Sequence, residues 1–426
     1  MLTARKVGLC KIVEKCFKNS LNYARANSHL KASEIKLSDL CIYIGILYVF
    51  KLGSISYLIP KFGVIYYGLA AIQLLLALFV YARGDVRLNK VHFGIAGYCA
   101  TLLFSTYVND VSMQISLNEV FCLLPLLVTA DMLFYRRDIE VVRRVSRFSI
   151  LMISLNTFTA LIFRNAMFRD VTGAPTIFLL GADNSLIPIY MVSSVLEMYK
   201  RKLEDAACCI PVVSLSNLLL FSMLRDIASG KLVGVLLVLL LTLAFFNKSF
   251  KFSFSLALGI NIAFFAIFVY GQSTISGLTG IFELLGRNST FTERSFLWAF
   301  GFRLFAMSPL LGLGSYSAAS FNNLVRALTI TGLFNTGNPH NSYLSILISG
   351  GLLAFSFVVF TVLQARVKPS DSFFNIFLFT FLLHAQVEGR DIVYIFFIVI
   401  VIYRFFHSDN QLSLRGDSRA AIHSFI

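Results

Sequence analysis

The chain has 426 residues, of which 57% are hydrophobic and only 14% are charged, and its mean hydropathy is +0.76. A soluble globular protein of this length needs much more charge to cover its surface, so the composition excludes that class. The net charge of +15 would suggest nucleic-acid binding in a soluble protein. The positions of the charges instead favour the lipid bilayer as the partner, with no nucleic acid.

A basic segment, residues 1–38, precedes the first apolar run and is too long for the charged start of a signal peptide. We predict that it is a cytosolic tail. Twelve apolar runs of membrane-spanning length follow, at 39–59, 62–82, 91–108, 116–135, 146–164, 182–199, 207–224, 231–247, 252–271, 342–365, 372–387 and 391–406. The sequence therefore predicts an all-α, polytopic membrane helix bundle of about 12 transmembrane helices.

The predicted organisation has five parts. These are a cytosolic tail (1–38), spans 1–9 (39–271), a large extracytoplasmic loop carrying the catalytic residues (272–341), spans 10–12 (342–406) and a second cytosolic tail (407–426). With both termini inside, the cytosolic segments hold 26 of the 37 Lys and Arg residues, the outer segments hold ten, and Lys51 falls inside the first span. That asymmetry is the positive-inside pattern, and it indicates a multi-pass protein of the inner membrane.

Two outer segments are longer than a tight turn, 165–181 and the loop 272–341. Within the second, residues 291–314 have an apolar middle that is too short and too charged to span. We expect a helix there that lies at the membrane interface or packs on the bundle, and that ends at Pro309, Gly312 and Gly314. None of the seven cysteines falls in an outer loop, so we expect no disulfides.

The segment 337–351, GNPHNSYLSILISGG, carries a histidine at the start of the tenth span. We expect Asn338 to cap that helix, Pro339 to take its first position and His340 to lie in its first turn. A neutral imidazole beside the positive end of a helix could serve as a general base next to an anion site. The alternative is a structural histidine that bonds to a loop carbonyl.

Cationic residues gather on the same predicted side, where positive-inside statistics disfavour them. Four lie in the large loop and two flank the turn between spans 7 and 8: Arg287, Arg294, Arg303, Arg326, Arg225 and Lys231. Arginine offers a fork of donors that suits phosphate oxygens. Arg294 and Arg303 are nine positions apart, so they should face opposite sides of one helix. Contact with lipid phosphate is the alternative role for each.

No pair of acidic residues has the spacing of a metal site, so we expect no metal and no other cofactor. Glu388, near the predicted outer face, is the next candidate for a base.

Together these motifs resemble the O-antigen polymerase and ligase family of membrane glycosyltransferases. The resemblance covers about 290–352 in detail, and more loosely the whole chain through its span count and large outer loop. The matching residues are Arg294 four before Trp298, the stretch Pro309–Gly314, and His340-Asn341 followed by Tyr343, Leu344, Gly350 and Gly351.

The resemblance implies an inverting, metal-independent enzyme. Such enzymes transfer a glycan from undecaprenyl pyrophosphate to a sugar hydroxyl at the extracytoplasmic face, in the synthesis of lipopolysaccharide, capsule or exopolysaccharide. It further implies that His340 is the catalytic base and Arg294 a pyrophosphate contact. Arg287, Arg303, Asn341 and Tyr343 are further candidates for substrate binding, and Lys231 or Arg225 for the family's basic residue at the eighth span.

The acceptor distinguishes two members of this family. A polymerase extends another lipid-linked repeat, whereas a ligase transfers the glycan to lipid A core; we favour the polymerase. A flippase and a chain-length regulator are further partners that the resemblance implies. A transporter or flippase is the alternative from another class, but few charged residues of this chain lie within spans, and a group of cations lies at the outer rim.

Overall fold

A computed structural model describes residues 36–164, 166–169, 176–206, 208–271, 294–316, 320–323, 325, 338–366, 371–389 and 392–407. In these ranges the regular secondary structure is helical, apart from isolated β-bridges that join Ile177 to Phe168 and to Ala182. The prediction of an all-α chain is therefore confirmed for the described residues. Most of both predicted tails and most of the segment 272–341 lie outside them.

Among the described residues, seven helices are long and apolar enough to cross a membrane. They are α4 (Gly63–Ala82), α5 (Lys90–Val108), α6 (Met113–Arg136), α7 (Ile139–Ile162), α10 (Ala228–Phe246), α11 (Phe254–Phe264) with its π-helical continuation η2 (Phe265–Gly271), and α16 (Ser342–Leu363). Shorter apolar helices are α2 (Leu37–Val49), α9 (Val212–Leu224), α14 (Arg294–Met307), α17 (Ser372–Val387) and α18 (Ile392–His407). The remaining elements are α8 (Asp183–Leu203), α3 (Gly53–Leu58) and η1 (Pro60–Phe62).

Every predicted span contains helix, but within the described residues only seven helices meet the length and composition of a span by themselves. A multi-pass membrane protein is supported, and twelve spans stays a prediction. The first predicted span, 39–59, is not one continuous helix, because α2 ends at Val49 and α3 begins at Gly53. The Leu52 N–H there donates to the Tyr66 hydroxyl at 2.8 Å, so the chain leaves the helix to make a tertiary hydrogen bond.

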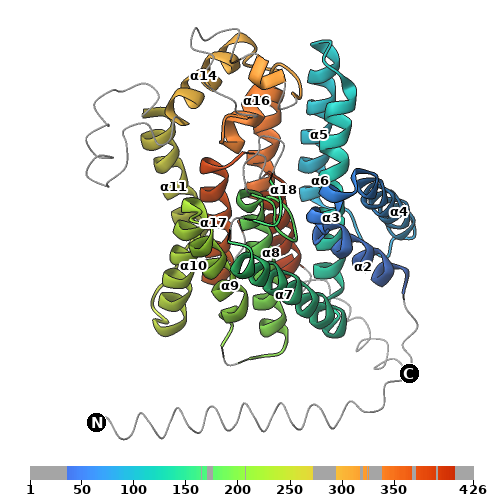
Figure 1. Ribbon diagram of the computed structural model, residues 1–426, viewed down its shortest axis with the longest axis vertical. Helices are drawn as coiled ribbons and strands as arrows, with labels where there is room; N and C mark the ends of the chain where they lie inside the picture. Colours follow the sequence, from blue (N-terminus) through green and yellow to red (C-terminus); the bar gives the residue numbers. More distant parts are fainter. Residues whose placement is uncertain are drawn as a thin grey trace, which may run out of the picture.

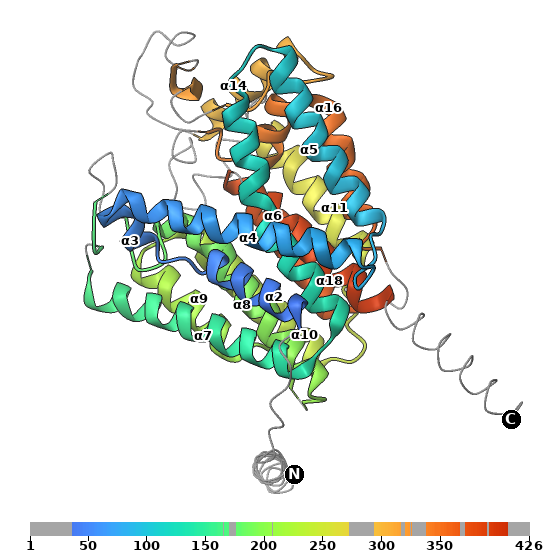
Figure 2. The same ribbon diagram turned by 90° about the vertical axis from the view of Figure 1, so that its right-hand side faces the viewer.

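The centre of the molecule is formed by α17 and α18, with α5 and α6 on one side and α10 and α11 on the other (Figure 1). All side chains of α17 from Phe374 to Val387 are buried, as expected of a helix that is apolar all round. α16 packs along α5, and α18 packs along α6. Figure 2 shows α4 and α7 running at a steep angle to α5 and α6.

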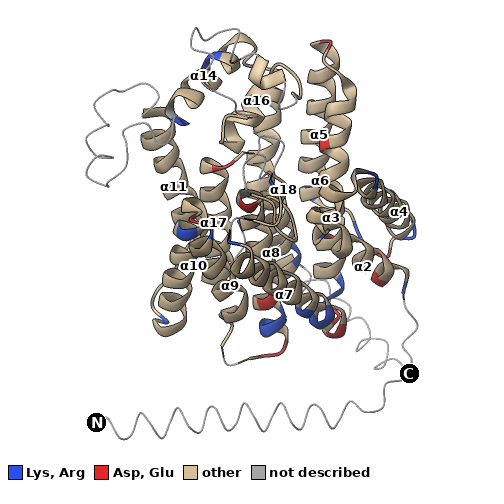
Figure 3. Cartoon of the chain, in the orientation of Figure 1, with Lys and Arg blue, Asp and Glu red and all other residues tan. Residues whose placement is uncertain are grey.

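Segments predicted on the cytosolic side contact one another through ion pairs. Arg136 pairs with Asp39, Lys202 pairs with Asp371, and Arg143 Nε lies 2.9 Å from Glu204 Oε1. Figure 3 shows acidic and basic residues gathered where α2 and α7 lie. These contacts agree with a common side for these segments, while the orientation of the termini stays a prediction.

Candidate functional site

His340 lies before α16 and not within it. Asn341 is the N-cap, and its Oδ1 accepts the Leu344 N–H at 3.0 Å, so the helix begins at Ser342. Asn338 Oδ1 instead accepts the His340 N–H at 2.7 Å, which forms a local turn. The prediction that Asn338 caps the helix was therefore wrong. His340 has a positive φ of 48°, which ends any helical continuation on its N-terminal side.

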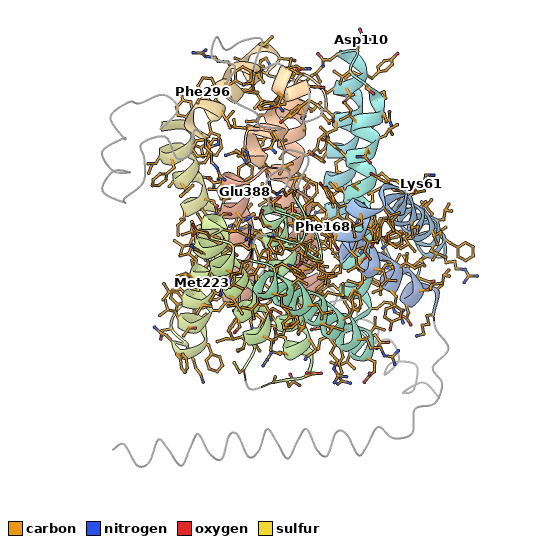
Figure 4. The ribbon with its side chains drawn as sticks, in the orientation of Figure 1. Lys61, Asp110, Phe168, Met223, Phe296 and Glu388 are labelled. Carbon is orange, nitrogen blue, oxygen red and sulfur yellow. The ribbon has the colours of Figure 1, made fainter. Side chains whose placement is uncertain are left out.

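Glu388 connects the groups that surround His340. Its Oε1 accepts a hydrogen bond from Arg294 Nη2 at 3.1 Å and one from Ser229 Oγ at 3.2 Å. Its Oε2 lies 3.7 Å from His340 Nδ1, beyond hydrogen-bond length. Its backbone carbonyl accepts the Ser342 hydroxyl at 2.9 Å. Four segments therefore meet at one carboxylate, which Figure 4 shows in the interior, away from the end marked by Asp110.

The Glu388 carboxylate is charged in this setting. Burial raises its pKa, but His340 and the positive charge of Arg294 lower it, with a contribution from His384, and together they bring the pKa to about 2. Burial alone would have favoured a protonated acid. At neutral pH the group is an anion that stabilises cations and accepts hydrogen bonds.

Arg294 is the first residue of α14, and it ties that helix to the end of α17. Besides Glu388, its guanidinium donates to the carbonyl oxygen of Val387. Its side chain is 20% exposed, so it is partly accessible. Arg303, nine residues later on the same helix, is exposed. This agrees with the prediction that the two arginines face different sides, and Arg287 lies outside the described residues.

Asn341 and Tyr343 hold the start of α16 against α17. The amide of the fully buried Asn341 donates to the Gln386 carbonyl at 2.8 Å, and the Tyr343 hydroxyl donates to the Leu382 carbonyl at 3.0 Å. Gln386 Nε2 in turn donates to Asn261 Oδ1 on α11 at 2.9 Å. These contacts position the backbone that carries His340, and substrate binding by Asn341 or Tyr343 stays a prediction.

The two basic residues around the α9–α10 turn have their own carboxylate partners. Arg225 Nη2 lies 3.5 Å from Asp183 Oδ2, its Nη1 donates to the Arg164 carbonyl at 2.6 Å, and its guanidinium lies over the Phe178 ring. Lys231 pairs with the exposed Asp226.

Ser229, in the first turn of α10, is the residue of this turn that reaches the Glu388 carboxylate. Lys231 lies two positions further along α10, about 200° around the helix, so it points away from Glu388. The family resemblance had instead implied that Lys231 or Arg225 is the functional residue of this turn. A serine that contacts an acid 159 residues away gives no local signal.

The motif Pro309–Gly314 packs against a break in α16. Gly351 has φ 62° and ψ −162°, so the helix is interrupted there. The freed groups are satisfied by the motif, since the Leu352 N–H donates to the Pro309 carbonyl at 2.8 Å and the Gly314 N–H donates to the Ser349 carbonyl at 3.0 Å. A Cβ on Gly351 would lie 2.3 Å from the Leu310 carbonyl oxygen. The motif therefore joins α14, which begins with Arg294, to the helix that follows His340.

The arrangement brings together an imidazole and a guanidinium that are both partly exposed, and a charged carboxylate. An imidazole can accept a proton from a hydroxyl, and a guanidinium can bind an anionic leaving group. Among the described residues, no group of three or more His, Cys, Asp and Glu is placed to hold a metal ion.

Residues 212–359 match a family model whose description is O-antigen ligase. The matched range runs from α9 to near the end of α16, and it includes Ser229, Arg294 and His340. Glu388 lies outside it. Neither the curated proteins nor the solved structures contain a match to the chain.

Proposed function

We propose that the chain belongs to the O-antigen ligase and polymerase family of membrane enzymes, because residues 212–359 match the O-antigen ligase model. Within that family we propose that it is a polysaccharide polymerase that uses a lipid-linked donor. The enzyme transfers a glycan from undecaprenyl pyrophosphate to a hydroxyl of an acceptor sugar, with inversion at the anomeric carbon. The reaction takes place at the extracytoplasmic face of the bacterial inner membrane. Its product belongs to an O-antigen, a capsule or an exopolysaccharide.

The observation that carries the proposal is the meeting of Arg294, Glu388 and His340 within a few ångströms. Arg294 Nη2 lies 3.1 Å from Glu388 Oε1, and His340 Nδ1 lies 3.7 Å from Glu388 Oε2. Because Nδ1 faces the carboxylate, Nε2 of the same ring is free to accept the acceptor's proton. Arg294 then stabilises the pyrophosphate as its charge develops.

The mechanism uses side chains in place of a metal ion. His340 takes the proton, the acceptor oxygen attacks the anomeric carbon, and the pyrophosphate leaves with the electron pair of the broken bond. Arg294 and further cations offset the charge of the leaving group. Arg225 and Arg287 are the candidates for these cations, because Lys231 points away from Glu388 and Arg303 faces a different side of α14 from Arg294. Membranes treated with a chelator should therefore keep their activity. Loss of activity that magnesium restores would contradict this mechanism.

A ligase is the second candidate, because the matched family model is described as an O-antigen ligase. The polymerase is preferred because the longest outer segment, 272–341, is short for a domain that must recognise a lipid A core. The two enzymes share donor, base and leaving group. They differ only in the acceptor.

One reconstitution tests the function and separates these candidates. Full-length protein in vesicles receives lipid-linked repeats from a strain that lacks this protein, with or without lipid A core. A polymerase extends the repeats and releases undecaprenyl pyrophosphate without the core. A ligase transfers glycan only when the core is present. If neither acceptor is used and no undecaprenyl pyrophosphate appears, the proposal is wrong.

A further inference from the structure

Glu388 is hydrogen-bonded to Arg294 but lies slightly too far from His340 for a hydrogen bond. Its bond to Arg294 is made by a single nitrogen of the guanidinium, at 3.1 Å. On its other side, His340 Nδ1 is 3.7 Å from Oε2, and the His340 side chain is 33% exposed. The Glu388 carboxylate is thus hydrogen-bonded to Arg294. Its distance to His340 Nδ1 exceeds the length of a hydrogen bond by less than 1 Å.

We propose that Glu388 exchanges partners when the donor binds: the donor's pyrophosphate takes Arg294, and the released carboxylate closes onto His340 Nδ1. This inference rests on the proposed function and adds to it a positioning residue. It means that the base is fully oriented only when a donor is present. An acceptor alone would then meet a less effective base.

The competition for Arg294 favours the pyrophosphate. A pyrophosphate carries more charge than a carboxylate and can bind the guanidinium through two parallel hydrogen bonds, whereas Glu388 uses one. Arg294 keeps its second anchor, the Val387 carbonyl, while it changes its anion. Ser229 continues to donate to Glu388 Oε1 at 3.2 Å, so that oxygen does not lose both of its partners.

The released carboxylate would improve the base in two ways. A hydrogen bond from Nδ1–H to Oε2 fixes the tautomer in which Nε2 carries the lone pair. When Nε2 accepts the proton of the acceptor hydroxyl, the ionised carboxylate stabilises the resulting imidazolium without taking a proton itself. The acceptor oxygen forms its bond to the anomeric carbon, the carbon–oxygen bond to the pyrophosphate breaks, and the electron pair leaves with the pyrophosphate. The imidazolium then returns its proton to water.

The test uses full-length protein in nanodiscs, with undecaprenyl pyrophosphate as the binding probe and lipid-linked repeat as the substrate. Glu388→Gln keeps the volume of the side chain and removes its charge. We expect the probe to bind about fivefold more tightly, because Arg294 no longer has a competing anion. Turnover at saturating donor should fall about a hundredfold, because the imidazolium loses its partner. Affinity and turnover thus change in opposite directions.

Two further variants make that result specific. Glu388→Asp retains the charge, so it should bind the probe as the wild type does while its turnover falls. Glu197→Gln removes a buried carboxylate that pairs with Arg201 on α8, and it should change neither quantity. If Glu388→Gln does not insert into the membrane, Glu388→Asp carries the test alone.

Weaker probe binding with normal turnover in Glu388→Gln or Glu388→Asp would overturn the partner exchange, because Glu388 would then only hold Arg294 in place. The double variant His340→Ala/Glu388→Gln separates this failure from failure of the proposed base. If His340→Ala is inactive, adding Glu388→Gln should cost no further turnover but should still tighten probe binding. If His340→Ala alone keeps its turnover, the assignment of the base is wrong.

Discussion

Two networks in this protein have the same three kinds of group, a carboxylate, an arginine and a histidine, but they are built very differently. In the first, Asp131 on α6 receives two hydrogen bonds from Arg404 on α18, at 2.6 and 2.8 Å, and one from the Tyr81 hydroxyl on α4 at 2.7 Å. His92 Nε2 on α5 lies 3.2 Å from the same carboxylate. This network joins four helices, and Asp131 is almost completely buried.

The second network is the one around Glu388, and it is less complete. Its arginine donates one hydrogen bond to the carboxylate in place of two, and its histidine is beyond hydrogen-bond length. The histidine of the first network is further fixed because His92 Nδ1 accepts the Asn89 N–H as part of a capping box. Three hydrogen bonds to the buried Asp131 carboxylate stabilise one arrangement of helices. The Glu388 carboxylate accepts two, and its arginine and histidine are partly exposed, so this second network can bind a substrate.

The comparison predicts that the first network is essential for stability. Asp131→Asn removes the charge that compensates a buried arginine, and such a change typically costs about 3–5 kcal/mol. The melting temperature in detergent and the amount of inserted protein should both fall. Glu204→Gln, which breaks a partly exposed pair with Arg143, is the control and should change stability by less than about 1 kcal/mol. Equal melting temperatures of Asp131→Asn and Glu204→Gln would show that the first network has no special role in stability.

Loss of the arginine fork from the second network should reduce activity much more than stability. Arg294→Lys keeps the charge but loses the fork, so transfer should fall about tenfold to a hundredfold, which corresponds to one hydrogen bond to a charged group. The melting temperature should stay close to that of the wild type. Arg326, which lies outside the described residues, is not one of the residues that carry the family resemblance. Arg326→Lys should therefore reduce transfer less than Arg294→Lys does. Full activity of Arg294→Lys in reconstituted vesicles would mean that only charge is needed there.

A substitution at the junction between Pro309–Gly314 and α16 should reduce both stability and activity, and each by an intermediate amount. Gly351 has backbone angles that are almost restricted to glycine, so Gly351→Ala should lower stability by about 1–3 kcal/mol and should also reduce transfer. Gly259→Ala on α11, where an added Cβ meets nothing within 4 Å, is the matched control and should be neutral or slightly stabilising. A fully active and stable Gly351→Ala would show that the break in α16 is not required.

The smallest effect concerns pH. The pKa of Glu388 is lowered from 4.5 to about 2, so its ionised form favours the folded state. Its contribution is complete above about pH 4.5 and is lost as the pH falls towards 2. The difference in melting temperature between wild type and Glu388→Gln should therefore be constant from pH 5 to 8 and should shrink in acid. An acid limb of activity above pH 5 that moves in Glu388→Gln would contradict this.

The helices could be predicted well from the sequence, because apolar runs and flanking charges are local signals. The resemblance also pointed to Arg294 and His340, which both lie near the Glu388 carboxylate in the structure, while their roles stay a prediction. The helix start was misjudged because two asparagines, Asn338 and Asn341, are both suitable caps, and only the tertiary contact of Asn341 with α17 decides between them. The break between α2 and α3 could not be predicted either, because it accompanies a tertiary hydrogen bond from the Leu52 N–H to the Tyr66 hydroxyl.

Other features of the site depend on contacts that no local pattern encodes. Glu388 was considered only as a substitute base, yet it is the residue on which the arginine, the serine and the start of α16 converge. Ser229 was passed over in favour of the cations beside it. Each of these contacts joins residues more than 40 positions apart, so helical periodicity carries no information about them.

The most direct test of the account compares the two histidines, His340→Ala and His92→Ala, in the same vesicles at equal amounts of inserted protein. We expect His340→Ala to melt as the wild type does and to lose transfer by about a hundredfold to ten-thousandfold, which is typical of a removed base. We expect His92→Ala to melt at a lower temperature and to keep its transfer once folded. Normal transfer by His340→Ala, with the loss of transfer found in His92→Ala, would contradict the central claim that the network around Glu388 performs the chemistry.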